Sequence, residues 1–247
     1  MKLLKNIPNF ITLLNLSMGI IAIYLTLKGD LAQFALAGYF VFLAALFDFF
    51  DGFAARMFKA VSPIGLQLDS LADVVSFGVA PGFILYRMIQ LSQRNPHDLF
   101  DGVNLISLLA ILVPWGAALR LAKFNIDETQ QEGFKGLPTP ANAFLIASLP
   151  IIRQQLYDEH GMINIIFTNT YFLIVVAIIG FFLMTSSFPM FGLKFKHFKW
   201  HSNEIKYIFA GMSVLLLLLF QIIAVPLIII LYLLVSLLVY LRNIKTK

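Results

Sequence analysis

The segments DFFDGFAAR (residues 48–56) and GLQLDSLAD (residues 65–73) decide the fold of this chain, because they place charged side chains inside a long apolar region. Together they contain four aspartates, at Asp48, Asp51, Asp69 and Asp73. An ionised carboxylate inside a bilayer is costly unless a partner compensates its charge. Hard divalent cations take carboxylate oxygens as ligands, so the pattern predicts a metal site in a membrane protein.

The composition supports a membrane location. The 247-residue chain is 60% hydrophobic and only 13% charged, and its mean hydropathy is +0.86. Soluble domains carry about 25% charged residues. The sequence has no cysteine, which excludes disulfides and thiolate metal sites. The net charge of +5 fits the excess of Lys and Arg on the cytoplasmic side of membrane proteins, so we expect no nucleic-acid partner.

Apolar segments of about 20 residues can cross a bilayer as helices. The sequence predicts an all-α integral membrane protein with eight such helices, at residues 9–27, 33–56, 66–90, 103–124, 140–156, 168–186, 205–222 and 226–242. Eight crossings place both termini on one side, and most Lys and Arg residues then lie on that side. The bias predicts a multi-pass protein of the cell membrane with cytoplasmic termini.

No internal repeat and no linker divides the chain. We therefore expect one transmembrane domain over residues 1–247. Its catalytic core would lie within about residues 8–200, and a C-terminal helix pair would follow at about residues 205–242.

The spacing of the aspartates suits a shared site. Residues three or four apart lie on one face of a helix, as Asp48 and Asp51 do, and as Gly65, Asp69 and Asp73 do. Both groups fall near the cytoplasmic ends of consecutive predicted helices. Two facing helices can therefore bring four carboxylates together there.

The neighbours of the aspartates indicate the chemistry. Gly52 leaves room for a bulky ligand, and Arg56 has a planar donor fork that suits phosphate. A set of carboxylates favours two hard divalent ions, Mg²⁺ or Mn²⁺, and the sequence does not decide which of the two metals binds. Paired metals can clamp both oxygens of an in-line phosphoryl displacement, so the cluster indicates diphosphate chemistry with an active site facing the cytoplasm.

A cation or proton pathway is the alternative of a different class, because intramembrane carboxylates also form ion relays. It leaves Gly52, Arg56 and the regular spacing unexplained.

The pattern D-x2-D-G-x2-A-R-x8-G-x3-D-x3-D resembles the signature of the CDP-alcohol phosphatidyltransferases, and the chain matches every fixed position. Members of that family transfer a phosphatidyl or similar group from a CDP-activated lipid to an alcohol and release CMP. The resemblance implies that Gly52 and Arg56 contact the nucleotide diphosphate and that Asp73 is also the general base. It implies four metal ligands, Asp48, Asp51, Asp69 and Asp73.

Softer motifs resemble the branch of the family that makes phosphatidylserine. They are PNFIT (8–12), DSLADVVSFGVAP (69–81), RLAKFN (120–125) and FKGLPTPANA (134–143). The resemblance implies CDP-diacylglycerol as donor, L-serine as acceptor, and a homodimer in the lipid bilayer. Glycerol 3-phosphate or inositol phosphate is the closest alternative acceptor, and each should need a denser basic pocket.

Further polar residues near the same layer are candidates for substrate contacts. The resemblance suggests that Asn9 and Thr12 contact the cytidine of CDP-diacylglycerol, and ordinary capping at a helix start is their alternative role. Ser62 suits a phosphate of the same substrate, and loop geometry before Pro63 is its alternative role. Gly65 lies on the stripe of Asp69. For serine or the transferred phosphate, the candidates are Arg120, Lys123, Asn125, Thr139 and Asn142. The alternative role of Arg120 and Lys123 is membrane anchoring. The alternative role of Asn125, Thr139 and Asn142 is capping at the ends of helices and loops.

Overall fold

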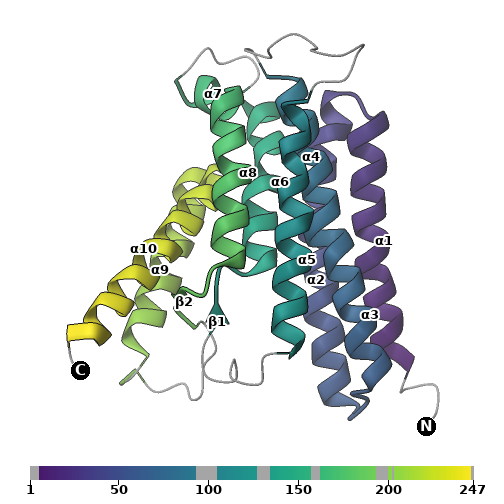
Figure 1. The fold of residues 1–247 in the computed structure, drawn as a ribbon, viewed down its shortest axis with the longest axis vertical. Coiled ribbons are helices and arrows are strands. Elements are labelled where there is room, and N and C mark those ends of the chain that lie inside the picture. Colours follow the sequence, from purple (N-terminus) through teal and green to yellow (C-terminus); the bar gives the residue numbers. More distant parts are fainter. Residues whose placement is uncertain are drawn as a thin grey trace.

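The computed structural model describes residues 6–92, 105–126, 134–156, 162–192, 200–201 and 203–245, and it is a helical bundle (Figure 1). The α-helices are α1 (Ile7–Lys28), α2 (Leu31–Met57), α3 (Pro63–Asp73), α4 (Ala80–Gln90), α5 (Leu112–Ile126), α6 (Thr139–Gln155), α7 (Met162–Phe167), α8 (Thr170–Thr185), α9 (Glu204–Phe220) and α10 (Ala224–Lys245). Each of the eight predicted segments coincides with helical structure over its described residues.

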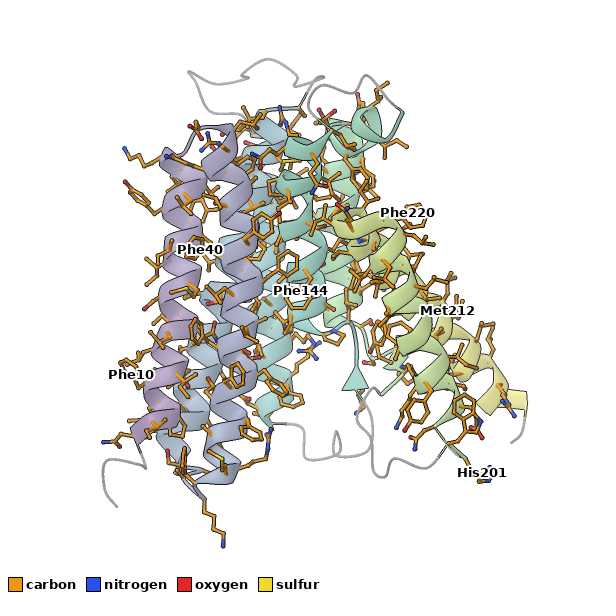
Figure 2. All side chains as sticks on the ribbon, turned by 180° about the vertical axis from the view of Figure 1, so that it is seen from behind. Phe10, Phe40, Phe144, His201, Met212 and Phe220 are labelled. Atoms are coloured by element: carbon orange, nitrogen blue, oxygen red, sulfur yellow. The ribbon has the colours of Figure 1, made fainter. Side chains whose placement is uncertain are left out.

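Five helical segments in the described part of the chain are long and apolar enough to cross a membrane. They are Ile7–Lys28, Leu31–Met57, Pro63–Gln90, Ser107–Ile126 and Glu204–Arg242. Carbon-rich side chains cover the outside of the helices, including Phe10, Met212 and Phe220 (Figure 2). The chain is therefore a helical membrane protein, as predicted. The last segment contains both α9 and α10, while α6 and α8 are shorter, so the count of eight crossings stays a prediction.

The third predicted helix is not uniform. It begins as α3, continues through a π-helical segment at Val74–Val79 and ends as α4. The π-helical segment starts directly after Asp73. Such segments are rare and occur often at functional sites, and nothing in the hydrophobic pattern predicts this one.

Small residues let the helices that carry the aspartates pack closely. Ala37 and Ala44 of α2 are fully buried. Gly38, also in α2, has no room for a side chain, because a Cβ atom there would overlap the carbonyl oxygen of Ala147 in α6. Close approach through small residues is the usual packing mode of membrane helices. It fixes α2 between α1 and α6.

The C-terminal helices form a hairpin. The chain reverses at Gln221, which has φ 49° and ψ −124°, five residues before Pro226. α10 then runs back beside α9, and the start of α1 and the end of α10 lie at the same end of the molecule (Figure 1). The sequence predicts this break between two apolar helices, but not its position at Gln221.

A two-residue antiparallel pair interrupts the all-α architecture. Strand β1 (Phe134–Lys135) pairs with β2 (Pro189–Met190), so the segment before α6 is tied to the segment after α8. Gly136 follows β1 with φ +74°, and a Cβ atom there would lie within 3 Å of three carbonyl oxygens. Only glycine suits this position, which sets the geometry of the entry into α6.

Candidate active site

Three of the four aspartates converge where the ends of α2 and α3 meet. Asp48 and Asp51 lie on α2, and Asp69 lies on α3. One ligand atom from each of the three lies within 4.8 Å of the others. The i, i+3 spacing on one helix and the facing position of the next therefore produce the convergence that the sequence predicts.

This acidic cluster fits a divalent cation. Asp51 is 5% exposed, and neither Asp51 Oδ2 nor Asp69 Oδ1 has a hydrogen-bond partner among the described residues. A buried carboxylate oxygen without a partner is strongly unfavourable, and three mutually close carboxylates repel one another. A hard cation with oxygen ligands removes both costs.

Asp73 lies one helical turn beyond Asp69 and has a different environment. It is 9% exposed, and its Oδ1 accepts a hydrogen bond from Asn15 Nδ2 at 3.1 Å. Its carboxylate interacts electrostatically with the carboxylates of Asp48, Asp51 and Asp69. It is thus next to the acidic cluster, but is not one of the three groups that converge most tightly.

Sequence reasoning missed Asn15. It is fully buried in α1, three residues after Thr12 and six after Asn9, so polar residues recur on one side of an otherwise apolar helix. That recurrence was the available signal. It extends the polar stripe of α1 from the entrance of the site to Asp73.

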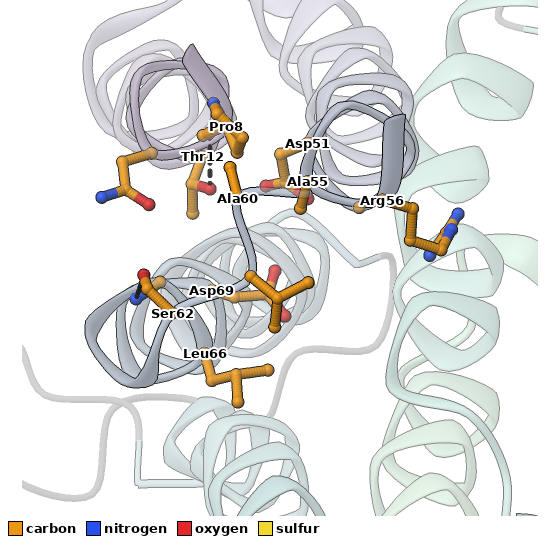
Figure 3. A pocket seen from close by; sticks show the side chains of 13 residues that line it. Pro8, Thr12, Asp51, Ala55, Arg56, Ala60, Ser62, Leu66 and Asp69 are labelled. Carbon is orange, nitrogen blue, oxygen red and sulfur yellow. Dashed lines mark hydrogen bonds between the residues drawn. The ribbon is translucent and has the colours of Figure 1, made fainter. Parts of the chain in front are cut away.

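A cleft of about 650 Å³ opens between α1, α2 and α3 beside the acidic cluster. In Figure 3, Thr12, Asp51 and Asp69 project toward the same space from these three helices. All six residues that the sequence suggests for CDP-diacylglycerol line this cleft, namely Asn9, Thr12, Gly52, Arg56, Ser62 and Gly65.

The cleft residues differ in whether their polar side-chain atoms already form hydrogen bonds within the protein. Thr12 Oγ1 donates to the Pro8 carbonyl at 3.0 Å, and Ser62 Oγ accepts from Gly65 N–H at 3.1 Å as the N-cap of α3. The structure therefore gives Ser62 a helix-capping role, whereas the sequence offered loop geometry as its alternative. Arg56 is exposed and points away from Thr12 at the rim of the cleft (Figure 3).

Gly52 offers a direct test of the cleft. A Cβ atom there would meet only Arg56 Nη1, at 3.4 Å, so Gly52→Ala should fold normally and gain helix propensity. We expect unchanged or higher thermal stability, but weaker binding of the CDP-diacylglycerol that the sequence resemblance implies, seen as a higher KM, because the methyl group enters the cleft. Gly211→Ala is the matched control, since its added Cβ meets nothing within 4 Å. An unchanged KM in Gly52→Ala would contradict a nucleotide in this cleft.

A second cavity, of about 900 Å³, lies where α5 and α8 end and β1 begins. Arg120, Lys123 and Lys135 bring three cations to its lining, together with Thr185, Ser186 and Ser187. Arg120 is buried and donates from Nη1 to Thr139 Oγ1 at 3.0 Å. Lys123 Nζ donates to the Thr185 carbonyl at 3.1 Å. We call this the basic cavity, and its chemistry suits an anionic group.

Three predicted residues lie outside the lining of the basic cavity, and Thr139 is connected to it only through its hydrogen bond with Arg120. Asn125 is exposed and donates from Nδ2 to Ser70 Oγ at 2.9 Å, which links α5 to α3. Asn142 is buried in α6 against Gly180 of α8, where a Cβ atom would lie 2.5 Å from Asn142 Oδ1. Conversely, Lys135 and the polar run at Thr185–Ser187 line the cavity and were not among the predicted contacts.

The C-terminal hairpin supports the wall of the basic cavity. Tyr232 of α10 donates from its hydroxyl to the Phe191 carbonyl at 3.0 Å, and Ser236 Oγ accepts from Phe191 N–H at 3.1 Å. Phe191 directly follows β2, which holds β1 and therefore Lys135. From the sequence these helices were notable only as hydrophobic.

The two cavities are linked through α5, which carries Arg120, because its Ala117 packs against Gly78 of the π-helical segment and its Asn125 donates to Ser70 of α3. Asp73 lies at the end of α3, directly before the π-helical segment against which α5 packs. An anionic donor held at cations in the cleft and an anionic acceptor held by Arg120 can meet beside its carboxylate.

Comparison with known proteins agrees with this arrangement. The family model for CDP-alcohol phosphatidyltransferases matches residues 5–241. The CDP-diacylglycerol–serine O-phosphatidyltransferase of Bacillus subtilis is 35% identical over 201 residues, covering 80% of this chain and 94% of the relative. The enzyme of that name from Methanocaldococcus jannaschii is 39% identical over 140 residues, covering 57% of this chain and 58% of the relative.

An archaetidylserine synthase of Methanothermobacter thermautotrophicus is 34% identical over 144 residues, covering 58% of this chain and 56% of the relative. The family match extends over nearly all of the chain, including the acidic cluster, the cleft and the basic cavity. The chain belongs to the CDP-alcohol phosphatidyltransferase family.

Proposed function

We propose that this protein transfers the phosphatidyl group of CDP-diacylglycerol to the hydroxyl of L-serine, giving phosphatidylserine and CMP. The observation that carries the proposal is the convergence of Asp48, Asp51 and Asp69 beside an open cleft. The relatives that are named CDP-diacylglycerol–serine O-phosphatidyltransferase support the choice of substrate.

The donor would occupy the cleft between α1, α2 and α3. Its cytidine would lie near Asn9 and Thr12, and its diphosphate would pass Gly52 and reach Arg56 and the acidic cluster. The acyl chains would remain in the surrounding lipid. This placement uses the small residue and the cation that line the cleft, as a nucleotide with a charged diphosphate requires.

Asp48, Asp51 and Asp69 would hold two divalent cations, Mg²⁺ or Mn²⁺, with Asp73 completing the site of the second. Bound there, the ions would neutralise the diphosphate and polarise the phosphorus that is attacked. Support comes from Asp51 Oδ2 and Asp69 Oδ1, two buried carboxylate oxygens without a hydrogen-bond partner in the described part of the chain.

Asp73 would accept the proton of the serine hydroxyl. As that proton leaves, the serine oxygen forms a bond to the phosphatidyl phosphorus, and the bond from the phosphorus to the CMP oxygen breaks in line with it. The bonding pair remains on CMP, which departs. Asp73 is suited to this task because it lies one helical turn after Asp69, and because α5, which carries Arg120, packs against the π-helical segment that begins directly after Asp73.

Serine would enter through the basic cavity, with its carboxylate at Arg120 and Lys123. Asn125, Thr139 and Asn142 remain proposed contacts of serine or the transferred phosphate. Thr139 would contribute at least by accepting the hydrogen bond that orients Arg120. We expect Lys123→Met to raise the KM for serine about tenfold and to leave the KM for CDP-diacylglycerol unchanged, because a single charged hydrogen bond is lost. Lys206→Met, in α9 outside the lining, is the control. A rise in both KM values would contradict separate cavities.

We further propose that the site faces the cytoplasm of a cell membrane and that the protein works as a homodimer. The end of α2, the end of α5, the start of α9 and the end of α10 lie at the same end of the bundle (Figure 1). The Lys and Arg residues at or near these element ends and in β1 are Arg56, Lys59, Arg120, Lys123, Lys135, Lys206 and Arg242. Such a bias marks the cytoplasmic side. The chain lacks cysteine, so single cysteines at Lys59 and Lys28 can be labelled with an impermeant reagent to read the orientation of each end.

Competition between acceptors tests the assignment of serine. Purified protein receives CDP-diacylglycerol and Mn²⁺ or Mg²⁺ with equal amounts of labelled serine and glycerol 3-phosphate. We expect label in lipid from serine alone. Lipid labelled from glycerol 3-phosphate instead would keep the family chemistry and overturn the assignment of serine.

A further inference from the structure

Asn15 connects α1 to the catalytic region through two adjacent attachments. Its side chain is completely buried, and Nδ2 donates to Asp73 Oδ1 at 3.1 Å. Its backbone carbonyl accepts a hydrogen bond from Ser76 Oγ at 3.0 Å. Ser76 is also fully buried and lies three residues after Asp73. One residue of α1 therefore holds both Asp73 and the π-helical segment that follows it.

Close packing makes this attachment rigid. Gly19 lies one turn after Asn15 in α1, and a Cβ atom at Gly19 would lie 2.5 Å from Ser76 Oγ and 2.8 Å from Ser76 Cα. Only hydrogen fits there, so α1 approaches the π-helical segment at the shortest possible distance. The position of the Asn15 amide relative to Asp73 is therefore set by backbone contact rather than by a flexible side chain.

The hydrogen-bonding capacity of Asn15 is only half used. Nδ2 faces Asp73, while Oδ1 is buried without a partner among the described residues. A flipped amide would point its oxygen at a carboxylate, so the charge of Asp73 dictates the orientation. An arrangement made for stability alone would satisfy the buried acceptor as well. The amide is instead placed to serve one carboxylate oxygen.

We propose that Asn15 is a positioning residue that holds Asp73 Oδ1 and thereby directs Oδ2 toward the hydroxyl of the acceptor. The inference rests on the proposed role of Asp73 as proton acceptor. The lone amide donor fixes the rotamer of Asp73 without supplying a charge. Asp73 is thus oriented by α1, whose N-terminal end also lines the cleft between α1, α2 and α3.

The test uses Asn15→Leu, which keeps the volume and removes the donor. We expect the kcat of serine-dependent CMP release to fall by about tenfold to a hundredfold, because a hydrogen bond to a charged group is lost. The KM for CDP-diacylglycerol and the binding of the first Mn²⁺ at Asp48, Asp51 and Asp69, followed by its electron paramagnetic resonance signal, should stay within about twofold. Ser76→Ala is the control: it removes only the backbone attachment and should lower thermal stability more than kcat.

A double variant separates positioning from general damage. In the Asp73→Asn background, Asn15→Leu should cause no further loss, because the carboxylate that it orients is already gone. A full additional loss in that background, or a wild-type kcat in the single variant, would overturn the inference and leave the proposed function standing. If the wild-type protein releases CMP only with another acceptor, the same ratios are measured with that acceptor. Absence of CMP release with every acceptor would overturn both proposals.

Discussion

Asp69→Asn should lower the rate of CMP release about a thousandfold while leaving the protein folded. Asp69 is the one member of the converging trio that comes from α3, so its loss opens the side of the acidic cluster opposite α2. Metal-assisted stabilisation of the transition state is worth several kcal/mol, and about 4 kcal/mol corresponds to a factor of a thousand. The measurement is CMP release at saturating substrates, together with Mn²⁺ binding.

Stability should move in the opposite direction. Without metal, the three close carboxylates repel one another, so removing one charge should leave the melting temperature of the metal-free protein unchanged or raise it. Asp30→Asn is the matched control, because Asp30 caps α2 outside the acidic cluster and Asn is an equally good cap. Normal turnover in Asp69→Asn would remove the acidic cluster from the reaction, and loss of folding would make it structural.

Asp73→Asn should lose between about a hundredfold and ten thousandfold in kcat, the usual contribution of general acid–base catalysis. The variant keeps the shape of the side chain and keeps Asp48, Asp51 and Asp69, so at least one Mn²⁺ per chain should still bind. The KM for CDP-diacylglycerol should change little, because the cleft is lined by Asp51 and Asp69 and not by Asp73. Steady-state kinetics and Mn²⁺ titration of the same preparation check both expectations.

The contrast between the two aspartates separates their roles. Asp69→Asn should lose metal binding and turnover together, whereas Asp73→Asn should lose turnover with the first metal retained. Near-normal turnover in Asp73→Asn would exclude it as the base. Complete loss of Mn²⁺ from Asp73→Asn would assign the residue to metal binding instead.

The convergence of Asp48, Asp51 and Asp69 was predictable because its geometry is local. Asp48 and Asp51 share a face of α2 through a spacing of three, and Asp69 follows on the next helix after a short turn. Gly52 and Arg56 lie on the same helix as Asp51. When consecutive apolar helices pack antiparallel, these side chains are brought together at one end of the bundle.

Other features depend on packing between distant segments. Asn15 and Asp73 are separated by 58 residues, and Tyr232 and Phe191 by 41. Lys135 reaches the basic cavity only because β1 pairs with β2. Hydrophobic periodicity carries no information on which polar residue of one helix faces which residue of another, so these contacts needed the structure.

The same limit explains the candidates that lie elsewhere. Thr139 and Asn142 share a face of α6, but only Thr139 contacts Arg120, while Asn142 faces Gly180 across the interface with α8. The sequence predicts a regular helix over residues 66–90. The π-helical segment at Val74–Val79 shifts the helical register after Asp73, and a regular helix has no such shift. Polar residues near one layer of a membrane can therefore serve different interfaces.

The most direct test is CMP release from CDP-diacylglycerol by the purified protein, with and without L-serine, in Mn²⁺ or Mg²⁺. Serine-dependent release of CMP, with one labelled serine in lipid for each CMP, is the predicted result, and chelation of the metal or Asp69→Asn should abolish it. No CMP from a folded sample with any acceptor, together with cation flux in liposomes, would contradict the transferase and indicate a transporter.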